Sequence, residues 1–251
     1  AQSPARPSPP RPPTPPHDLA LMRDATPLDA LAGRIADALP QTQCTRCGFD
    51  DCDAYARAVA SGEAGINQCP PGGAEGIHRL AALTGKSYRP LDPAHGTEGP
   101  RHVAVIDEAW CIGCTLCLAA CPTDAIFGAN KRMHTVIEAW CTGCELCIPA
   151  CPVDCIRLEN ITGERKGWLA WSPAEAETAR ERYRLHRQRR AADAEANAER
   201  LQKKAEMKLA DLAAHSQHTD PVILDQKRRV IEAALERARA RNNQGGGRDT
   251  P

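Results

Sequence analysis

The stretch "WCIGCTLCLAACP" at residues 110–122 decides the fold, because it returns thirty residues later as "WCTGCELCIPACP" at residues 140–152. Both copies space four cysteines as C-x2-C-x2-C-x3-C and follow the last one with proline. The wider repeat covers residues 108–126 and 138–156. A copy of this length is too short to be an independent domain, so we expect the pair to form one domain with internal pseudo-twofold symmetry.

The cysteines of this repeat have the spacing of iron–sulfur ligands. Three thiolates at three-residue intervals can hold three irons of one four-iron cluster, whereas the fourth leaves the loop on a turn of helix and points to the partner site, as in two-cluster ferredoxins. Gly113 and Gly143 let the loop backbone approach the cluster sulfides. Zinc is the alternative metal, but zinc sites usually pair two C-x2-C units across a longer gap. The expected sets are Cys111, Cys114, Cys117 with Cys151, and Cys141, Cys144, Cys147 with Cys121.

A third group of four cysteines lies nearer the N-terminus. Cys44, Cys47, Cys52 and Cys69 have the spacing C-x2-C-x4-C-x16-C. We expect the chain to be cytosolic, and the cytosol keeps thiols reduced. Its thirteen cysteines therefore argue for metal ligation rather than disulfides. For this group the spacing alone admits zinc as well as an iron–sulfur cluster.

Several residues beside the cysteines have two interpretations. Cys155 is either redox-active or a small buried side chain next to a cluster, and we favour packing because free cysteine is among the most buried residue types. Trp110 and Trp140 either shield the clusters from water or only pack. For His134 we expect a surface or packing role rather than ligation or proton transfer, since cysteines already fill three sites.

The composition limits what the rest of the chain can do. The first sixteen residues contain eight prolines and nothing to bury, so we expect a disordered arm. No apolar run reaches the roughly eighteen residues that span a bilayer. We find no nucleotide-binding fingerprint and no nucleophile–base pair, which argues against an active site for a small-molecule substrate.

We expect five segments along the chain. They are a Pro-rich arm (1–25), an N-terminal iron–sulfur module (26–86), a linker (87–99), the two-cluster domain (100–162) and a charged helical tail (163–251). A helix is expected to open the N-terminal module, because Thr26 can cap it and Pro27 suits its first position.

The tail is predicted to be helical. Residues 172–175, "SPAE", form a capping box, and a second helix should start at Asp220-Pro221. Residues 172–251 contain seventeen Lys and Arg against thirteen Asp and Glu. We favour a solvated helix with charges of alternating sign over a nucleic-acid-binding one. The second helix has an apolar stripe that either docks on a partner or folds back on the two-cluster domain: Ile223, Val230, Ile231 and Leu235.

The two cysteine modules, in this order and at these spacings, resemble the B-type subunit of the Rnf-type electron transport complex. The resemblance covers roughly residues 27–158 and extends to the stretches "MHTV" and "CPVDCI". It implies three [4Fe–4S] clusters, with Cys44, Cys47, Cys52 and Cys69 as the ligands of the first. Members of that family usually begin with a hydrophobic membrane anchor, and a polar Pro-rich arm stands here instead, so we expect a variant without the anchor.

We therefore expect an α+β fold, in which a small helical iron–sulfur module precedes a ferredoxin-like two-cluster domain and a long helical tail follows. The expected function is electron transfer through three [4Fe–4S] clusters to redox protein partners, among them the other subunits of an Rnf-like membrane complex. The alternative is a free-standing soluble polyferredoxin that serves another reductase or a redox regulator, and a DNA-associated iron–sulfur protein is a weaker one. The expected location is the cytoplasm or the cytoplasmic face of the inner membrane.

Overall fold

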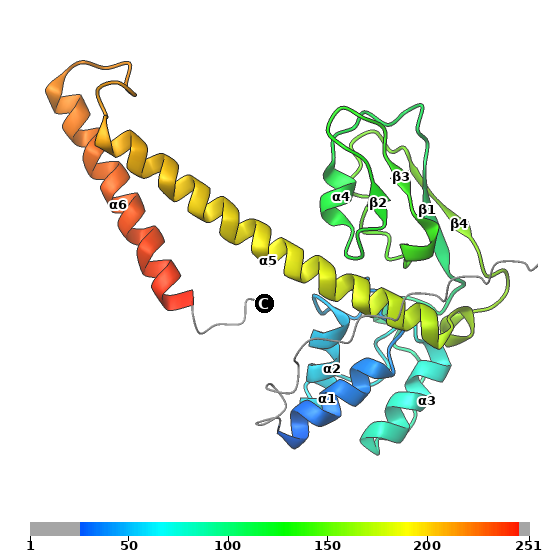
Figure 1. Cartoon of the computed structure of the whole chain (residues 1–251). Helices are drawn as coiled ribbons and strands as arrows, with labels where there is room; N and C mark the ends of the chain where they lie inside the picture. Colours follow the sequence, from blue (N-terminus) through cyan, green and yellow to red (C-terminus); the bar gives the residue numbers. More distant parts are fainter. Residues whose placement is uncertain (1–25, 246–251) are drawn as a thin grey trace, which may run out of the picture. The chain divides into compact units, whose positions relative to one another are not determined.

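The computed structural model describes residues 26–245, so the Pro-rich arm predicted over residues 1–25 lies outside the described part. The chain divides into two compact units, and the division falls between Tyr183 and Arg184. The first unit has the mixed α+β architecture expected from the sequence, and the second is helical (Figure 1). None of the helices between residues 26 and 245 combines the length and the apolarity that crossing a membrane requires.

Three helices form the N-terminal part of the first unit: α1 (Pro27–Asp37), α2 (Cys52–Ser61) and α3 (Gly73–Thr84). α1 begins where the sequence predicts, because Thr26 and Asp29 form a reciprocal capping box at its start. The helices enclose a small core whose most buried apolar members are Ile35, Leu39, Tyr55, Ile77 and Leu80.

Residues 87–99, predicted as a linker, pack on these helices. They contain a short 3-10 helix, η2 (Pro93–His95). The Nδ1 atom of His95 lies 3.0 Å from the carbonyl oxygen of Arg46, in the loop that carries the first cysteines. The carboxylate of Glu98 accepts a hydrogen bond of 3.2 Å from the first turn of α3. The segment is therefore attached to the N-terminal part rather than free of it.

Residues 100–162 contain two small antiparallel ribbons. β1 (His102–Ile106) pairs with β4 (Ile156–Asn160), and β2 (Ile126–Phe127) pairs with β3 (Thr135–Val136). Extending the thirty-residue shift to the flanking residues aligns β1 with β3 and β2 with β4, so β1 and β2 go with the first copy of the repeat and β3 and β4 with the second. Each ribbon thus joins one strand from each copy, which is the interlocking that a pseudo-twofold repeat predicts.

The two copies differ after their cysteine loops. The first continues into the short helix α4 (Leu116–Ala120), in which the N–H of Ala119 donates to the carbonyl of Thr115 at 3.3 Å. Pro149 stands at the equivalent position of the second copy and has no N–H to donate. The second copy therefore has turns there, and its loop is preceded by the 3-10 helix η3 (Glu138–Trp140).

Residues 163–172 pack onto the N-terminal helices of the first unit. The 3-10 helix η4 (Gly167–Ala170) buries Trp168, whose indole Nε1 donates to the carbonyl oxygen of Ala38 at 2.9 Å. The guanidinium of Arg79, on α3, lies 4.2 Å from the centre of the indole ring. Trp168 therefore links the end of α1 to α3.

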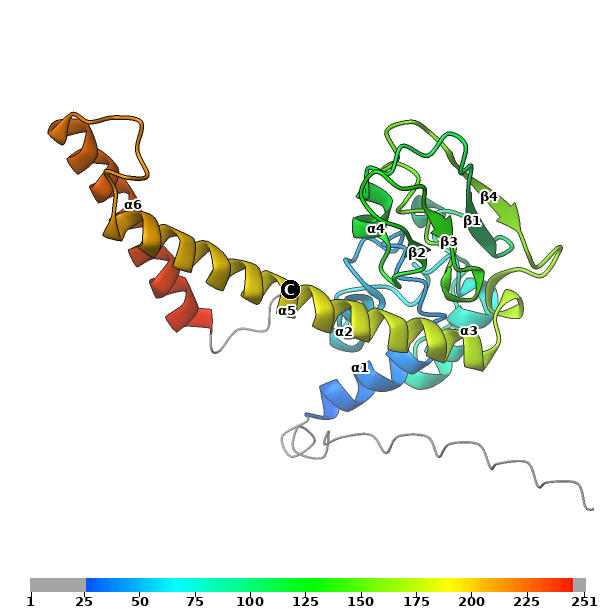
Figure 2. The same cartoon turned by 45° about the horizontal axis from the view of Figure 1, so that its top comes forward.

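The first turns of α5 (Pro173–Ala210) lie between the N-terminal helices and the ribbons (Figures 1 and 2). The predicted capping box is present, with reciprocal hydrogen bonds between Ser172 and Glu175 of 2.8 and 3.2 Å. The Glu175 carboxylate also binds the buried guanidinium of Arg101 at 2.7 Å. The start of α5 is therefore tied to the strand region.

Two further side chains of α5 hold it against the first unit. Arg182 donates from Nε to the carbonyl oxygen of Thr123 at 3.0 Å, and the hydroxyl of Tyr183 donates to Asp51 at 2.9 Å. These contacts are why the compact unit extends to Tyr183, whereas the sequence suggested that the tail begins at residue 163. The expected solvated helix is therefore wrong for these first turns, which bury Ala176 and Ala179.

In the second unit, the end of α5 runs antiparallel to α6 (Pro221–Gly245), which begins after Asp220 as predicted (Figure 1). Leu212 and Leu235 are buried there, and Arg239 of α6 pairs with Glu206 of α5 at 2.9 Å. Val230, another member of the predicted stripe, is 67% exposed. The stripe is thus used in part within this helical hairpin.

Candidate metal centres

Four thiols of the N-terminal part come together from three elements. Cys44 and Cys47 lie in the loop after α1, Cys52 is the first residue of α2, and Cys69 precedes α3. The pKa of Cys52 rises well above its ordinary value, first through burial and then through repulsion by the other three sulfurs. The other three sulfurs therefore lie near enough to Cys52 to disfavour a charge on it, and we treat the four thiols as one set.

The loop between α1 and α2 has a backbone that only specific contacts can hold. Gln41, Gln43 and Thr45 all adopt the left-handed region, with φ of 59°, 54° and 58°. Two buried glutamines fasten the loop: Gln41 donates to a carbonyl of α1 at 2.6 Å, and Gln43 donates to Gln41 at 2.9 Å. The side-chain oxygen Oε1 of Gln43 also accepts a hydrogen bond from the backbone N–H of Cys52 at 2.9 Å. The glutamine chain therefore ties the cysteine loop to the helices on both sides.

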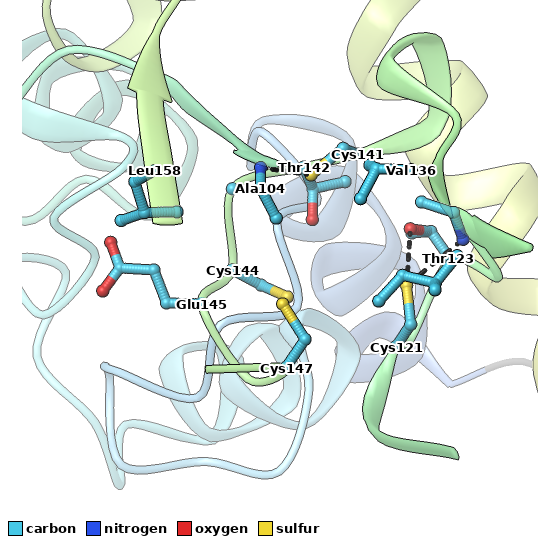
Figure 3. Close-up of a pocket in the computed structure, with 13 residues that line it drawn as sticks. Ala104, Cys121, Thr123, Val136, Cys141, Thr142, Cys144, Glu145, Cys147 and Leu158 are labelled. Carbon is cyan, nitrogen blue, oxygen red and sulfur yellow. Dashed lines mark hydrogen bonds between the residues drawn. The ribbon is translucent and has the colours of Figure 1, made fainter. Parts of the chain in front are cut away.

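One pocket of the strand region contains four thiols from both copies of the repeat. Cys121 of the first copy lines the same pocket as Cys141, Cys144 and Cys147 of the second (Figure 3). Burial raises the pKa of both Cys144 and Cys147 to about 12, and the sulfur of Cys121 contributes to each rise. The structure thus brings the last cysteine of the first copy to the loop of the second.

The complementary set lies around the loop of the first copy. Burial raises the pKa of Cys117 to about 11, with further contributions from the sulfurs of Cys114 and Cys111. The Sγ atoms of Cys151 and Cys155 are 3.4 Å apart. The pKa of Cys155 rises to about 12 through burial, through its hydrogen bond with Cys151 and through the nearby sulfur of Cys111. Cys151, from the second copy, therefore lies beside the loop of the first.

Backbone N–H groups are directed at the cysteine sulfurs in both copies. Amide donors favour the thiolate form, and they tune the potential of a bound cluster. Desolvation would raise the pKa of Cys151, but hydrogen bonds from Cys155 and Val153 leave it below its ordinary value. Four of the N–H to Sγ bonds are 3.2–3.4 Å long and join Ala104 to Cys141, His134 to Cys111, Ala125 to Cys121, and Cys155 to Cys151.

Two glycines give the cysteine loops a left-handed backbone. Gly113 and Gly143 both have φ of +68°. A Cβ atom on Gly113 would collide with the backbone of Arg132, and one on Gly143 would collide with the carbonyl oxygen of His102. Only glycine therefore allows the first loop to lie this close to the turn before β3, and the second loop to lie this close to β1.

These thiols fit a group that brings positive charge into a buried site. Thiols with raised pKa values keep their protons at neutral pH, so a metal group must displace those protons on binding. In the part of the chain that the structure describes, no three His, Cys, Asp or Glu side chains converge as ligands of a single ion. Three sets of four thiols with amides directed at sulfur fit iron–sulfur clusters, and ligation by the individual cysteines stays a prediction.

The N-terminal cysteine loop contacts the loop of the second copy. The hydroxyl of Thr142 donates to the carbonyl oxygen of Thr42 at 2.9 Å. Arg46, between Cys44 and Cys47, forms an ion pair of 2.5 Å with Glu145. The N-terminal set of thiols therefore lies next to the set that contains Cys144.

The loop of the first copy is exposed where that of the second is covered. Trp110, Ile112 and Leu116 are 70%, 58% and 51% exposed. The equivalent Trp140 is half-buried, with the guanidinium of Arg182 lying 3.7 Å from the centre of its ring. A shielding role is thus compatible with the position of Trp140 and not with the exposure of Trp110.

Sequence reasoning missed two contacts with cysteine thiols, one made by the side chain of His134 and one made by the side chain of Cys155. His134 is 1% exposed, and its Nδ1 atom lies 3.3 Å from the Sγ atom of Cys117, whereas we expected only a surface or packing role. Cys155 is buried, as expected for packing, but it also contacts Cys151. A signal was available, because the repeat aligns both residues with alanines.

The geometry agrees with what similar proteins are described to contain. A family model described as "4Fe-4S dicluster domain" matches residues 104–158, and one described as "Putative Fe-S cluster" matches residues 39–71. The chain is similar to the B-type subunit of the ion-translocating oxidoreductase complex (RnfB) of Azoarcus sp. (strain BH72), with 59% identity over 140 residues, which are 56% of this chain and 76% of that protein. The RnfB protein of Alkalilimnicola ehrlichii is 53% identical over 152 residues, which are 60% of this chain and 81% of that protein. That of Thiobacillus denitrificans is 63% identical over 107 residues, 43% of this chain and 57% of that protein.

Proposed function

The chain belongs to the RnfB family of ion-translocating oxidoreductase complexes and transfers electrons through iron–sulfur clusters, and from this premise we propose that it carries three [4Fe–4S] clusters. The sorting of twelve thiols into three partly buried sets is the observation that supports this number. The proposed ligands are Cys44, Cys47, Cys52 and Cys69 for the first cluster, Cys111, Cys114, Cys117 and Cys151 for the second, and Cys141, Cys144, Cys147 and Cys121 for the third.

A [4Fe–4S] cluster, when bound, takes up or releases one electron at a potential that its surroundings set. The residues of this chain supply those surroundings. The thiolates would bind the irons, backbone amides such as that of Ala104 would stabilise the negative charge on sulfur, and the apolar core would keep water away. The exchange of Cys121 and Cys151 between the copies also locks the two halves of the domain together.

We propose that electrons pass through the three sets in series. The contacts of Thr142 with Thr42 and of Arg46 with Glu145 support a neighbouring position for the N-terminal set and the set of Cys144. The set of Cys117 lies next to the exposed loop around Trp110, where a redox protein can approach. The proposed order is therefore the first, the third and then the second cluster.

The proposed partners are redox proteins, among them the other subunits of an ion-translocating complex, to which this chain would attach peripherally at a membrane. The alternative is a free-standing polyferredoxin that serves another reductase or a redox regulator. Cell fractionation separates the two, because a member of the complex sediments with membranes and the alternative stays in the supernatant. The proposed modules remain residues 26–86 and 100–162.

Metal analysis under anaerobic conditions tests the number of clusters. We expect about twelve irons and about twelve acid-labile sulfides per chain, four of each per cluster. A result of eight irons with one zinc would assign zinc to the N-terminal set and contradict the three-cluster proposal.

Two matched variants test the exchange of ligands between the copies. Cys121→Ser should change the paramagnetic spectrum of the same cluster as Cys141→Ser, and Cys151→Ser the same cluster as Cys111→Ser. If Cys121→Ser and Cys111→Ser instead affect one cluster together, each copy holds its own four ligands and the proposed assignment is wrong.

A further inference from the structure

The pseudo-twofold repeat allows each residue near one cluster to be compared with its counterpart near the other. A shift of thirty residues aligns Ala104 with His134. Their backbone N–H groups donate hydrogen bonds to the sulfurs of equivalent cysteines. That of Ala104 donates to Cys141 at 3.4 Å (Figure 3), and that of His134 donates to Cys111 at 3.3 Å. The backbone contribution at this position is therefore matched between the two sets.

The same shift aligns Ala125 with Cys155. The N–H of Ala125 donates to the sulfur of Cys121 at 3.2 Å, and the N–H of Cys155 donates to the sulfur of Cys151 at 3.4 Å. At both pairs of positions the main chain is thus equivalent and only the side chains differ.

The side chain of His134 adds a hydrogen bond to one set. Its Nδ1 atom is 3.3 Å from the sulfur of Cys117, and a thiolate bound to iron has no proton to donate, so Nδ1–H must be the donor. The ring is 1% exposed and packs against Gly128, where a Cβ atom would collide with it. Its Nε2 atom is buried and has no hydrogen-bond partner among the described residues. An apolar side chain would avoid that cost, so packing alone does not explain a histidine here.

The side chain of Cys155 adds a second hydrogen bond to the same set. Its sulfur is 3.4 Å from that of Cys151 and is buried. The same reasoning applies, because a ligating Cys151 thiolate can only accept, which leaves the S–H group of Cys155 as the donor.

The other set has no counterpart to these donors at the equivalent positions. Ala104 and Ala125 carry methyl groups, which donate nothing. The hydroxyl of Thr123 lies 3.8 Å from the sulfur of Cys121, but its proton is directed to the carbonyl oxygen of Trp140 at 2.8 Å.

One more hydroxyl lies close to the set that contains Cys144. Thr142 contributes to lowering the pKa of Cys144, which burial raises overall. The single hydroxyl proton of Thr142 donates to the carbonyl oxygen of Thr42 at 2.9 Å. The side-chain donors of the two sets are therefore unequal, and the set of Cys117 has the stronger ones.

We infer that His134 and Cys155 are positioning residues that raise the reduction potential of the cluster proposed at Cys111, Cys114, Cys117 and Cys151 above that of its pseudo-symmetric partner. A hydrogen bond to a ligand sulfur stabilises the more negative, reduced state more than the oxidised one. With both clusters bound, the added donors of His134 and Cys155 would favour the electron on the cluster of Cys117 over its partner, beside the exposed loop around Trp110. The transfer would form or break no bond and would move no proton. The inference rests on the proposed ligand sets.

Anaerobic redox titration of the purified full chain, followed by paramagnetic resonance, tests this inference. His134→Leu keeps volume without a donor, and Cys155→Ala restores the residue of the other copy. Each should lower the potential of one and the same cluster, and together they should shift the electron partition between the two clusters about tenfold, which is about 59 mV for a one-electron couple. His134→Asn keeps a donor and should retain the higher potential, as should Met133→Leu at an exposed neighbour.

The converse variant, Ala125→Cys, should raise the potential of the other cluster. Iron content is measured first, because loss of four irons in Cys155→Ala would make Cys155 a ligand and overturn the inference. Full iron content with unchanged potentials also overturns it and leaves the relay intact. Shifts in two different clusters for His134→Leu and Cys155→Ala contradict a shared target. A wild-type chain with too little iron for two clusters in the repeat would instead refute the proposed function.

Discussion

The first turns of α5 and the rest of the same helix are alike in composition and differ in surroundings. Both parts are rich in Ala, Arg and Glu and contain few large apolar residues. Residues 173–183 nevertheless belong to the first compact unit and bury Ala176 and Ala179, whereas residues 184–210 belong to the second and are mostly exposed. A helix that looks uniform in sequence thus belongs to the first unit at its N-terminal end only.

The difference shows that polar anchors can integrate a helix without an apolar face. Arg180 donates to the carbonyl oxygen of Ala36 at 3.2 Å, and Arg182 donates to that of Thr123. Carbonyl acceptors occur at every residue, so their use leaves no pattern in the sequence of the partner segment. Small alanines then allow α5 to approach closely. Hydrophobic periodicity alone therefore underestimates how much of α5 belongs to the first unit.

The largest loss of stability is expected when the chain is shortened to end before η4, and a second, longer truncation serves as its control. A chain ending at Thr162 loses Trp168 and the partner of Arg101, so we expect it to be less stable by at least about 4 kcal/mol. A chain ending at Ala192 keeps all anchors of the first unit and should match the full chain. Thermal loss of visible cluster absorbance under anaerobic conditions measures both.

The comparison between the two ends of α5 fails if the two shortened chains behave alike. Equal stability would mean that residues 163–183 contribute nothing to the body, as the predicted boundary at residue 163 implied. Equal destabilisation would mean that the second unit also supports the first.

Trp168→Ala should have the next largest effect. The indole is buried, donates to Ala38 and lies beneath Arg79, and removing a buried aromatic side chain costs about 3–5 kcal/mol. Trp168→Phe keeps most of the packing and loses only the Nε1 donor, so about 1–2 kcal/mol is expected. The same thermal measurement applies, and an unaffected Trp168→Ala chain would show that η4 is not an anchor.

Leu235→Ala should destabilise the second unit alone. Leu235 is 6% exposed in the helical hairpin, and truncating a buried leucine costs about 2–5 kcal/mol. Helical circular dichroism should show earlier melting of the hairpin, while the loss of cluster absorbance should be unchanged. Val230→Ala, at a residue that is 67% exposed, is the matched control and should change neither signal. Earlier cluster loss in Leu235→Ala would contradict the division after Tyr183.

Glu175→Gln should have the smallest effect and a characteristic pH dependence. Desolvation raises the pKa of Glu175, but its hydrogen bonds with Ser172 and the charge of Arg101 leave it below the ordinary 4.5. The carboxylate therefore contributes stability above about pH 4.5, and this is lost as the pH falls through the lower folded pKa.

Because the carboxylate is half exposed, we expect Glu175→Gln to cost only about 1 kcal/mol at neutral pH. Denaturant unfolding at about pH 7, pH 5 and pH 4 compares the variant with the wild type. The difference should be equal at the two higher values and smaller at the lowest. A difference that grows on acidification would contradict the lowered pKa.

Much of the candidate site follows from local sequence. The three sets of cysteines, the predicted exchange of Cys121 and Cys151, and the glycines at positions 113 and 143 follow from residue spacing and from the thirty-residue repeat. The contacts of His134 and Cys155 needed the repeat to be compared position by position. That comparison shows where the copies differ, but it does not show that both differences point at the same thiols.

The sequence by itself determined the grouping of the cysteines, the α+β class and the starts of α1, α5 and α6, since these features follow from residue spacing, from the thirty-residue repeat and from local capping. Tertiary structure alone decided that Trp168 and the first turns of α5 belong to the body, and that the loop of Thr42 lies against Thr142. It also decided that His134 reaches Cys117. These contacts join residues that are far apart in the chain or lie in different strands and loops, and their partners are often backbone atoms that every residue carries. Only the folded chain selects among so many equivalent partners.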